Sequence, residues 1–235
     1  SHSVGVMNVE TPEKPQISSV ITPERDLSLL RVFIGYLGAD YLVRGAPLSY
    51  GFAGVIEQSG KWEGGVLSVV LALLALWYFP INQQHVGLTF QQRPGSLWFS
   101  LGALTLVLLP RVAYSLVYPQ IPISDPAKLW YNILGAPLSE ELAFRGIAFA
   151  IAIAAFGTTA RGIRWSVSIT AAAFGLAHAF HDTPTGVAFS STVFLQISIY
   201  GMIFGAVRAR SGSLLFPILC HIAMNAAVPL VLLFS

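Results

Sequence analysis

Two adjacent carboxylates and one guanidinium lie near the middle of an apolar run that extends from about Leu129 to Phe156. The charged stretch reads SEELAFRG over residues 139–146. A run of this length can cross a bilayer, which takes about 20 residues in a helix. A charged side chain at the centre of such a helix costs at least about 2.5–3.5 kcal/mol, so a cluster there marks a functional site. The run therefore predicts a membrane-embedded helix whose polar residues have a function.

The two carboxylates of this stretch have different surroundings in a helix. Glu141 and Arg145 are four residues apart on one helix face, in the favourable order with the acid first. Glu140 is rotated by roughly 100° from Glu141, because an α-helix has about 3.6 residues per turn. We therefore expect Glu141 and Arg145 to form a buried ion pair that stabilises a helix crossing. Glu140 is then the carboxylate expected to carry out chemistry.

The composition places the whole chain in a membrane. Hydrophobic residues make up 54% of the 235 residues and charged residues 10%, whereas soluble domains average about 25% charged. The net charge of +2 is small and scattered, which argues against binding of nucleic acid. The single Cys220 excludes an internal disulfide and a multi-cysteine metal site. The even spread of apolar runs predicts an all-α fold, a polytopic bundle of transmembrane helices.

The chain divides into three parts by composition. Residues 1–25 are polar and contain proline, so we expect a mobile N-terminal tail and no cleavable signal peptide. Residues 26–96 are expected to form accessory helices, and residues 97–235 a catalytic helix bundle.

Apolar runs define the expected helices. Asp26 is a candidate cap for a helix that reaches Arg44, and Pro110 and Pro137 should kink the helices that contain them. The remaining helices are expected at Val66–Phe79, Leu97–Tyr118, 129–156, Ile163–Phe180, Val187–Arg208 and Leu214–Phe234. The count is seven or eight spans. It depends on the helix that reaches Arg44, which could span the bilayer or lie at its interface, and on the Gly-rich region 46–64, which is expected to be a loop or a re-entrant segment.

The distribution of Lys and Arg predicts the orientation in the membrane. A cytoplasmic N-terminus places seven basic residues inside and three outside: Lys14, Arg25, Arg93, Arg161, Arg164, Arg208 and Arg210 against Arg44, Lys61 and Lys128. We therefore expect an integral protein of a bacterial or archaeal inner membrane, with the N-terminus in the cytoplasm and the C-terminus outside.

Two further sets of polar residues occur in the last three expected helices. Phe174 and His178 are four residues apart near the end of one helix, and His221 and Asn225 have the same spacing well inside another. The bundle interior is the destination that keeps His178, His221 and Asn225 out of lipid, and it would bring them to Glu140. A carboxylate shielded from bulk water can act as a general base, and a neighbouring histidine can hold the water. A second histidine with an asparagine can donate to a developing oxyanion.

The three motifs Glu-Glu-x-x-x-Arg, Phe-x-x-x-His and His-x-x-x-Asn, each on its own apolar helix, resemble the CAAX-protease and bacteriocin-processing (CPBP, or Abi) family. Type II CAAX prenyl endopeptidases are its best-known members. The resemblance covers roughly residues 97–234 and implies a glutamate-dependent intramembrane endopeptidase, of a kind formerly classed as a metalloprotease. Its substrate would be a membrane-tethered protein or peptide. The family leads us to expect eight spans, one more than the seven counted.

The resemblance also implies roles for individual residues. Glu140 would activate water together with His178, while His221 and Asn225 would form the oxyanion hole. Glu141 and Arg145 would be the supporting ion pair, and Phe174 would pack beside His178. No cofactor is expected on this mechanism.

Two other functions remain open from the residues alone. The same enzyme could act through zinc, with Glu140, His178 and His221 as ligands and a water in the fourth position. Asn225 has no place in such a site. Alternatively, the buried carboxylates could serve a proton- or ion-coupled transporter. No inverted repeat of the kind found in many transporters is visible in the sequence.

Overall fold

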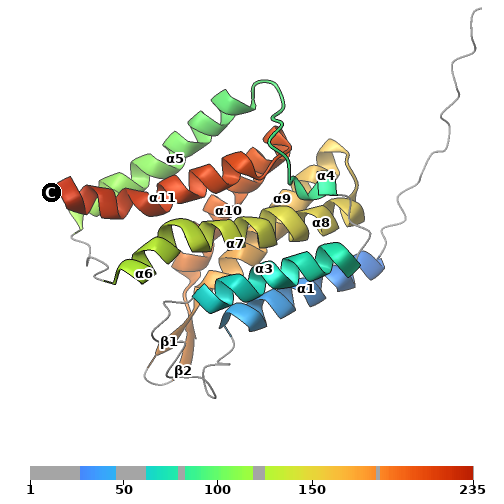
Figure 1. The fold of residues 1–235 in the computed structure, drawn as a ribbon, viewed down its shortest axis with the longest axis horizontal. Helices are drawn as coiled ribbons and strands as arrows, with labels where there is room; N and C mark the ends of the chain where they lie inside the picture. The colour runs from blue at the N-terminus through green and yellow to red at the C-terminus, as the bar shows by residue number, and fades with distance from the viewer. Residues whose placement is uncertain (1–26, 46–61, 79–82, 119–124, 184–185, 235) are drawn as a thin grey trace, which may run out of the picture.

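The computed structural model describes residues 27–45, 62–78, 83–118, 125–183 and 186–234, and the predictions for residues 1–25, Asp26 and most of region 46–64 lie outside them. The described residues form a helical bundle with one β-hairpin (Figure 1). The first half contains α1 (Leu27–Gly45), α3 (Trp62–Tyr78), α4 (Gln83–Val86) and α5 (Ser96–Val117). The second contains α6 (Pro126–Trp130), η1 (Tyr131–Gly135), α7 (Ala136–Glu140), η2 (Glu141–Ala148), α8 (Phe149–Phe156), α9 (Ala160–Ala179), β1 (Phe180–Thr183), β2 (Gly186–Phe189), α10 (Ser191–Ser211) and α11 (Leu215–Phe234).

Three of the described helices are long and apolar enough to cross a membrane: α5, α10 and α11. A shorter apolar helix covers Gly64–Tyr78 in α3. The predicted helical bundle is thus present, whereas the predicted count of seven or eight spans is not confirmed. The predicted spans that are not among these three include α1 and α9. Both helices are long enough to cross a membrane, but their charged residues make them more polar: Arg31, Asp40 and Arg44 in α1, and Arg161 and Arg164 in α9.

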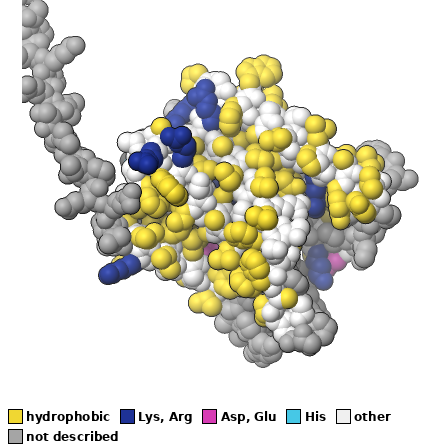
Figure 2. Space-filling view, turned by 180° about the vertical axis from the view of Figure 1, so that it is seen from behind, with side chains coloured by type: hydrophobic (Ala, Val, Ile, Leu, Met, Phe, Trp, Pro, Cys, Tyr) yellow, Lys and Arg dark blue, Asp and Glu magenta, His cyan; other side chains and the backbone are white. Residues whose placement is uncertain are grey.

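Apolar side chains cover much of the outer surface (Figure 2). On α5, Leu106, Leu109 and Leu116 are each more than 60% exposed. Exposed apolar area of this extent is expected of a protein whose solvent is lipid, because a soluble monomer seldom leaves large apolar patches uncovered.

The segment that carries the charged cluster is one helical path from Pro126 to Phe156. Its start is capped by Asp125, whose side chain accepts hydrogen bonds from the backbone N–H groups of Ala127 and Lys128. Pro137 lies in the first turn of α7, directly after the π-helical turn η1. Proline has no N–H and therefore cannot donate the α-helical hydrogen bond to the carbonyl four residues earlier. The change from π-helical to α-helical bonding takes place where this donor is missing. Pro137 therefore marks a change of register inside a continuing helix.

A hairpin interrupts the helices between α9 and α10, where the sequence predicted none. Phe180 belongs to β1 and Val187–Phe189 to β2, so the predicted ends of Ile163–Phe180 and Val187–Arg208 were wrong by a few residues. A short apolar run has no periodicity that separates strand from helix. Gly186, with φ of +130°, opens β2, and the Ser190 side chain caps α10 by accepting from the Val193 N–H.

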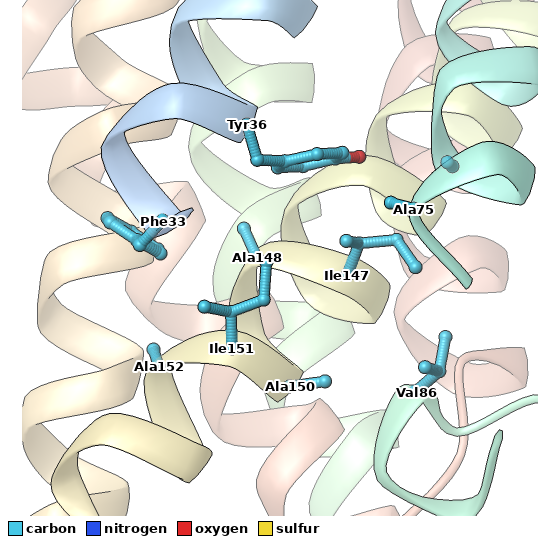
Figure 3. Packing of buried hydrophobic residues seen from close by; sticks show 10 residues of the cluster. Phe33, Tyr36, Ala75, Val86, Ile147, Ala148, Ala150, Ile151 and Ala152 are labelled. Atoms are coloured by element: carbon cyan, nitrogen blue, oxygen red, sulfur yellow. The ribbon is translucent and has the colours of Figure 1, made fainter. Parts of the chain in front are cut away.

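The interior of the bundle is packed from small and aromatic side chains. Figure 3 shows one cluster between α1, α3, α4, η2 and α8, with Phe33 and Tyr36 against Ile147 and Ile151. Helices α9 and α10 pack so closely at Gly175 that a Cβ added there would lie 2.6 Å from the Phe194 carbonyl oxygen. Small residues permit this approach in membrane bundles. The close contact fixes the last turn of α9, which carries Phe174 and His178.

Candidate active site

Glu140 lies between two histidines that come from different helices. Its carboxylate oxygens are 3.7 Å from Nε2 of His178 on α9 and 3.8 Å from Nε2 of His221 on α11. Glu140 is the last residue of α7, so three segments that are far apart in the sequence meet at this carboxylate. The structure therefore brings together three of the four residues that the sequence singled out for catalysis.

The other ring nitrogens of the two histidines determine how each imidazole is protonated. Nδ1 of His178 is 2.8 Å from the Phe174 carbonyl oxygen, and Nδ1 of His221 is 2.8 Å from Oε1 of Glu141. Both oxygens accept hydrogen bonds, so each Nδ1 carries the proton that it donates. In the neutral form of each ring, Nε2 then presents a lone pair toward Glu140.

Glu141 and Arg145 form the predicted ion pair, with Nη1 of Arg145 at 3.1 Å from Oε1 of Glu141. Both side chains are fully buried. The same Glu141 oxygen also accepts the hydrogen bond from His221, which the sequence did not predict. Glu141 thus links its own helix to α11 and orients the His221 ring.

Aromatic rings surround this buried network. The Arg145 guanidinium carbon is 4.1 Å from the Phe174 ring centroid and 5.6 Å from that of Phe204. Cation–π contacts of this kind stabilise a guanidinium withdrawn from water. Phe174 also lies edge-on to His178, with centroids 4.6 Å apart, and Phe204 stacks on His221 at 5.2 Å. Phe204 was missed from the sequence, because an apolar residue on an apolar helix gives no signal of its own.

Asn225 lies one helical turn beyond His221 and reaches a different segment. Its Nδ2 donates a hydrogen bond to the backbone carbonyl oxygen of Asn132, at 2.7 Å, in the π-helical turn η1. A carboxamide nitrogen carries two protons, so this bond occupies one of them and leaves one N–H for a further acceptor. Asn225 therefore has both an anchor and a remaining donor. The anchor Asn132 was not identified from the sequence.

A buried arginine supports the charged segment from behind. Arg208 on α10 donates from Nε to the Arg145 carbonyl oxygen at 3.2 Å and from Nη2 to the His85 carbonyl oxygen at 2.6 Å. Arg145 belongs to the π-helical stretch η2, where the wide turns alter the α-helical bonding. The guanidinium thus ties η2 to α4 and α10. The sequence showed Arg208 only as a positive charge near a helix end.

Exposure differs strongly within the cluster. The Glu141, Arg145 and His221 side chains are at most 4% exposed. Glu140 is 13% exposed and His178 34% exposed. Water and substrate therefore have access to the cluster from the side of Glu140 and His178. Strand β1 begins on this side, two residues after His178. Among the described residues, no group of three or more His, Cys, Asp and Glu side chains has the arrangement expected of a metal site.

These features define an integral membrane protein with a polar site enclosed in its helix bundle and open on one side. Residues 122–227 match the family model described as type II CAAX prenyl endopeptidase Rce1-like. The matched range includes Glu140, His178, His221 and Asn225. The match agrees with the resemblance to the CAAX-protease family that the three sequence motifs predicted. Comparison with curated proteins and with solved structures gave no significant match.

Proposed function

We propose that the protein hydrolyses a peptide bond of a membrane-tethered protein or peptide, using a water molecule activated by Glu140. The observation that carries this proposal is the position of the Glu140 carboxylate, 3.7 Å and 3.8 Å from Nε2 of His178 and His221. These separations exceed the usual hydrogen-bond length of about 2.7–3.2 Å, a range in which a bridging water is to be considered.

Glu140 and His178 act together on the water. A water beside them donates one proton to the carboxylate and the other to the Nε2 lone pair of His178, which leaves an oxygen lone pair for attack on the substrate carbonyl. Glu140 accepts the proton as the C–O bond forms and transfers it to the leaving amine as the C–N bond breaks. The bond from Nδ1 of His178 to the Phe174 carbonyl keeps the ring in the required tautomer.

His221 and Asn225 stabilise the negative charge that develops on the substrate oxygen. His221 donates from Nε2 when both ring nitrogens carry protons, and Glu141, bonded to Nδ1, then supplies the opposite charge. Asn225 donates through the N–H that its bond to Asn132 leaves over. Donors held in place before the reaction are effective because no reorganisation is needed as the charge appears.

The function is tested with purified protein in liposomes and an internally quenched, farnesylated peptide that ends in a CAAX sequence. We expect one peptide bond to be cut, identified by mass spectrometry, with the non-prenylated peptide cut more slowly. Absence of hydrolysis of both peptides would contradict the proposal.

The zinc mechanism is separated from this proposal in the same assay. A glutamate mechanism predicts that activity is retained after dialysis against a strong chelator and that metal analysis finds less than one zinc per chain. Activity that is lost on chelation and returns with zinc would assign Glu140, His178 and His221 as metal ligands instead.

A further inference from the structure

The hairpin β1–β2 adjoins the open side of the site. β1 starts at Phe180, two residues after His178, and the strand continues away from the end of α9. Two residues of extended chain span about 7 Å. A peptide lying along this hairpin is thus brought directly to His178 and Glu140.

The hairpin leaves backbone hydrogen-bonding groups on its outer edges. Phe180 pairs with Phe189 and Asp182 with Val187, while the Ser190 N–H donates to the Ala179 carbonyl oxygen. Bonded and non-bonded pairs alternate along an antiparallel ladder. The bond at Ser190 therefore makes the Phe180–Phe189 and Asp182–Val187 pairs the non-bonded ones, whose N–H and C=O groups point outward. Among the described residues, no third strand covers either edge.

One face of the hairpin carries three exposed apolar side chains. Phe180 and Phe189 contact each other across the strands, with ring centroids 5.3 Å apart, and are 42% and 50% exposed. Val187 lies on the same face, because side chains of alternate residues share a face, and it is 69% exposed. Exposed aromatic residues beside the end of a membrane-spanning helix, here the start of α10, are expected at the bilayer surface. A membrane-tethered peptide leaves the bilayer at that level.

We propose that an outer edge of this hairpin binds the substrate peptide as an added β-strand and guides the scissile bond to Glu140. This inference depends on the proposed peptidase function and names the substrate conformation: an extended backbone that offers N–H and C=O groups. Pairing through the main chain gives affinity with little dependence on side chains. The edge thus accepts varied sequences, while the membrane tether restricts which peptides reach it.

Proline substitutions test the edge without removing the hairpin's own hydrogen bonds. Asp182→Pro on β1 and Val187→Pro on β2 each delete one outward N–H, and proline is tolerated at such edge positions. The matched controls are Asp182→Ala and Val187→Ala, which change the side chain and keep the N–H. With the farnesylated peptide, we expect at least one proline variant to raise KM about tenfold, with both alanine variants within about twofold of the unaltered protein.

Backbone N-methylation of the peptide provides the complementary change. Methylation at the paired amide should raise KM with the alanine variant but add little with the proline variant, because both changes remove the same strand pairing. The proposal is contradicted if all four variants have the same KM, or if methylation has the same effect in the proline and alanine variants.

Cysteine cross-linking gives a readout that requires neither turnover nor a proline. The chain has one cysteine, the buried Cys220, so Asp182→Cys or Val187→Cys introduces a single reactive thiol. A second cysteine in the farnesylated peptide should form a disulfide with one of these positions, and not with Leu106→Cys on the lipid-exposed side of α5. Equal cross-linking at all three positions would overturn the strand proposal. Cross-linking at the hairpin without hydrolysis would instead contradict only the proposed peptidase function.

Discussion

Glu140 and Glu141 are adjacent in the sequence but differ in surroundings. Glu141 is fully buried and bonded to both Arg145 and His221. Glu140 retains 13% exposure beside the two Nε2 atoms. A base must exchange protons with water and substrate, whereas a buried ion pair must keep its charge balanced. The difference in burial therefore supports the proposal that Glu140 is the base and that Glu141 has a structural role.

Removal of the Glu141 charge should destabilise the protein. Glu141→Gln leaves the Arg145 guanidinium buried without a carboxylate partner, and breaking a buried pair in this way costs about 3–5 kcal/mol. We expect a clear fall in the thermal unfolding temperature in detergent, together with loss of activity. Glu140→Gln is the matched control and should unfold near the temperature of the unaltered protein. Equal unfolding temperatures for both variants would contradict the structural role of Glu141.

Truncation of Asn225 should slow the chemical step. Asn225→Ala removes a proposed oxyanion donor, and the loss of one such donor lowers kcat by about 10²–10³-fold. KM for the farnesylated peptide should change little, because the donor is needed most in the transition state. Steady-state kinetics in liposomes measures both constants. A rise in KM with unchanged kcat would show that Asn225 binds the substrate rather than the transition state.

Local spacing predicted part of the site at this scale. The four-residue separation of Glu141 and Arg145 was sufficient to predict their ion pair, because helix geometry alone determines it. The bond between Glu141 and His221 joins residues 80 positions apart. Nothing in either helix specifies the angle at which they meet, so this bond and the contact of Phe204 with His221 required the structure.

At the scale of single elements, the close packing of α9 and α10 holds the last turn of α9. A Cβ on Gly175 would overlap Ser198 Oγ and lie 2.6 Å from the Phe194 carbonyl oxygen. Gly175→Ala should therefore push the helices apart at a cost of about 1–3 kcal/mol, as expected of overpacking. We expect lower thermal stability and reduced kcat, because Phe174 and His178 shift. Gly102→Ala on α5, where no atom lies within 4 Å of the added Cβ, is the control that should leave both unchanged.

Arg208 supports the π-helical stretch η2 through the Arg145 carbonyl oxygen. Arg208→Met keeps most of the side-chain volume but leaves the Arg145 and His85 carbonyl oxygens without their donor. An unsatisfied buried polar group costs about 1–3 kcal/mol, so we expect reduced stability in chemical unfolding. Arg210→Met, at an exposed neighbouring arginine, should have a smaller effect. An effect of equal size in both variants would show that the stability depends on the positive charge rather than on the buried hydrogen bonds of Arg208.

The sequence predicted which segments form helices, but it did not predict where the hydrogen bonding changes from α-helical to π-helical. Apolar length located α5, α10 and α11 to within a few residues. The π-helical turn η1 ends two residues before Pro137, and η2 carries Glu141 and Arg145. The spacing of apolar residues does not distinguish such turns from an α-helix. The hairpin escaped prediction because Val187–Phe189 is too short and too apolar to show a strand period.

The whole molecule has a basic end and an opposite end that carries the hairpin. At the basic end, Arg93 donates a hydrogen bond to the Ala209 carbonyl oxygen, and Arg210 donates one to the Pro94 carbonyl oxygen. These two bonds hold the end of α10 against the chain that precedes α5. Helix α10 extends from the hairpin to this basic end over about 30 Å, close to the hydrocarbon thickness of a bilayer. The positive-inside rule therefore predicts that the hairpin lies on the outer side.

Labelling with a membrane-impermeant maleimide checks this orientation. In intact cells, Val187→Cys should react and Arg210→Cys should not, and inside-out vesicles should give the reverse. Buried Cys220 keeps the background low. The opposite pattern would show that the site opens toward the cytoplasm and that the orientation assigned from the arginines is wrong.

The central claim is that Glu140 is the base of a hydrolytic site. The most direct measurement compares the hydrolysis rate of the farnesylated peptide by Glu140→Gln with that of the unaltered protein, after confirming equal unfolding temperatures. A general base contributes about 10²–10⁴-fold to the rate, so the variant should lose at least that factor in kcat. A folded Glu140→Gln variant that cleaves at the rate of the unaltered protein would contradict the account.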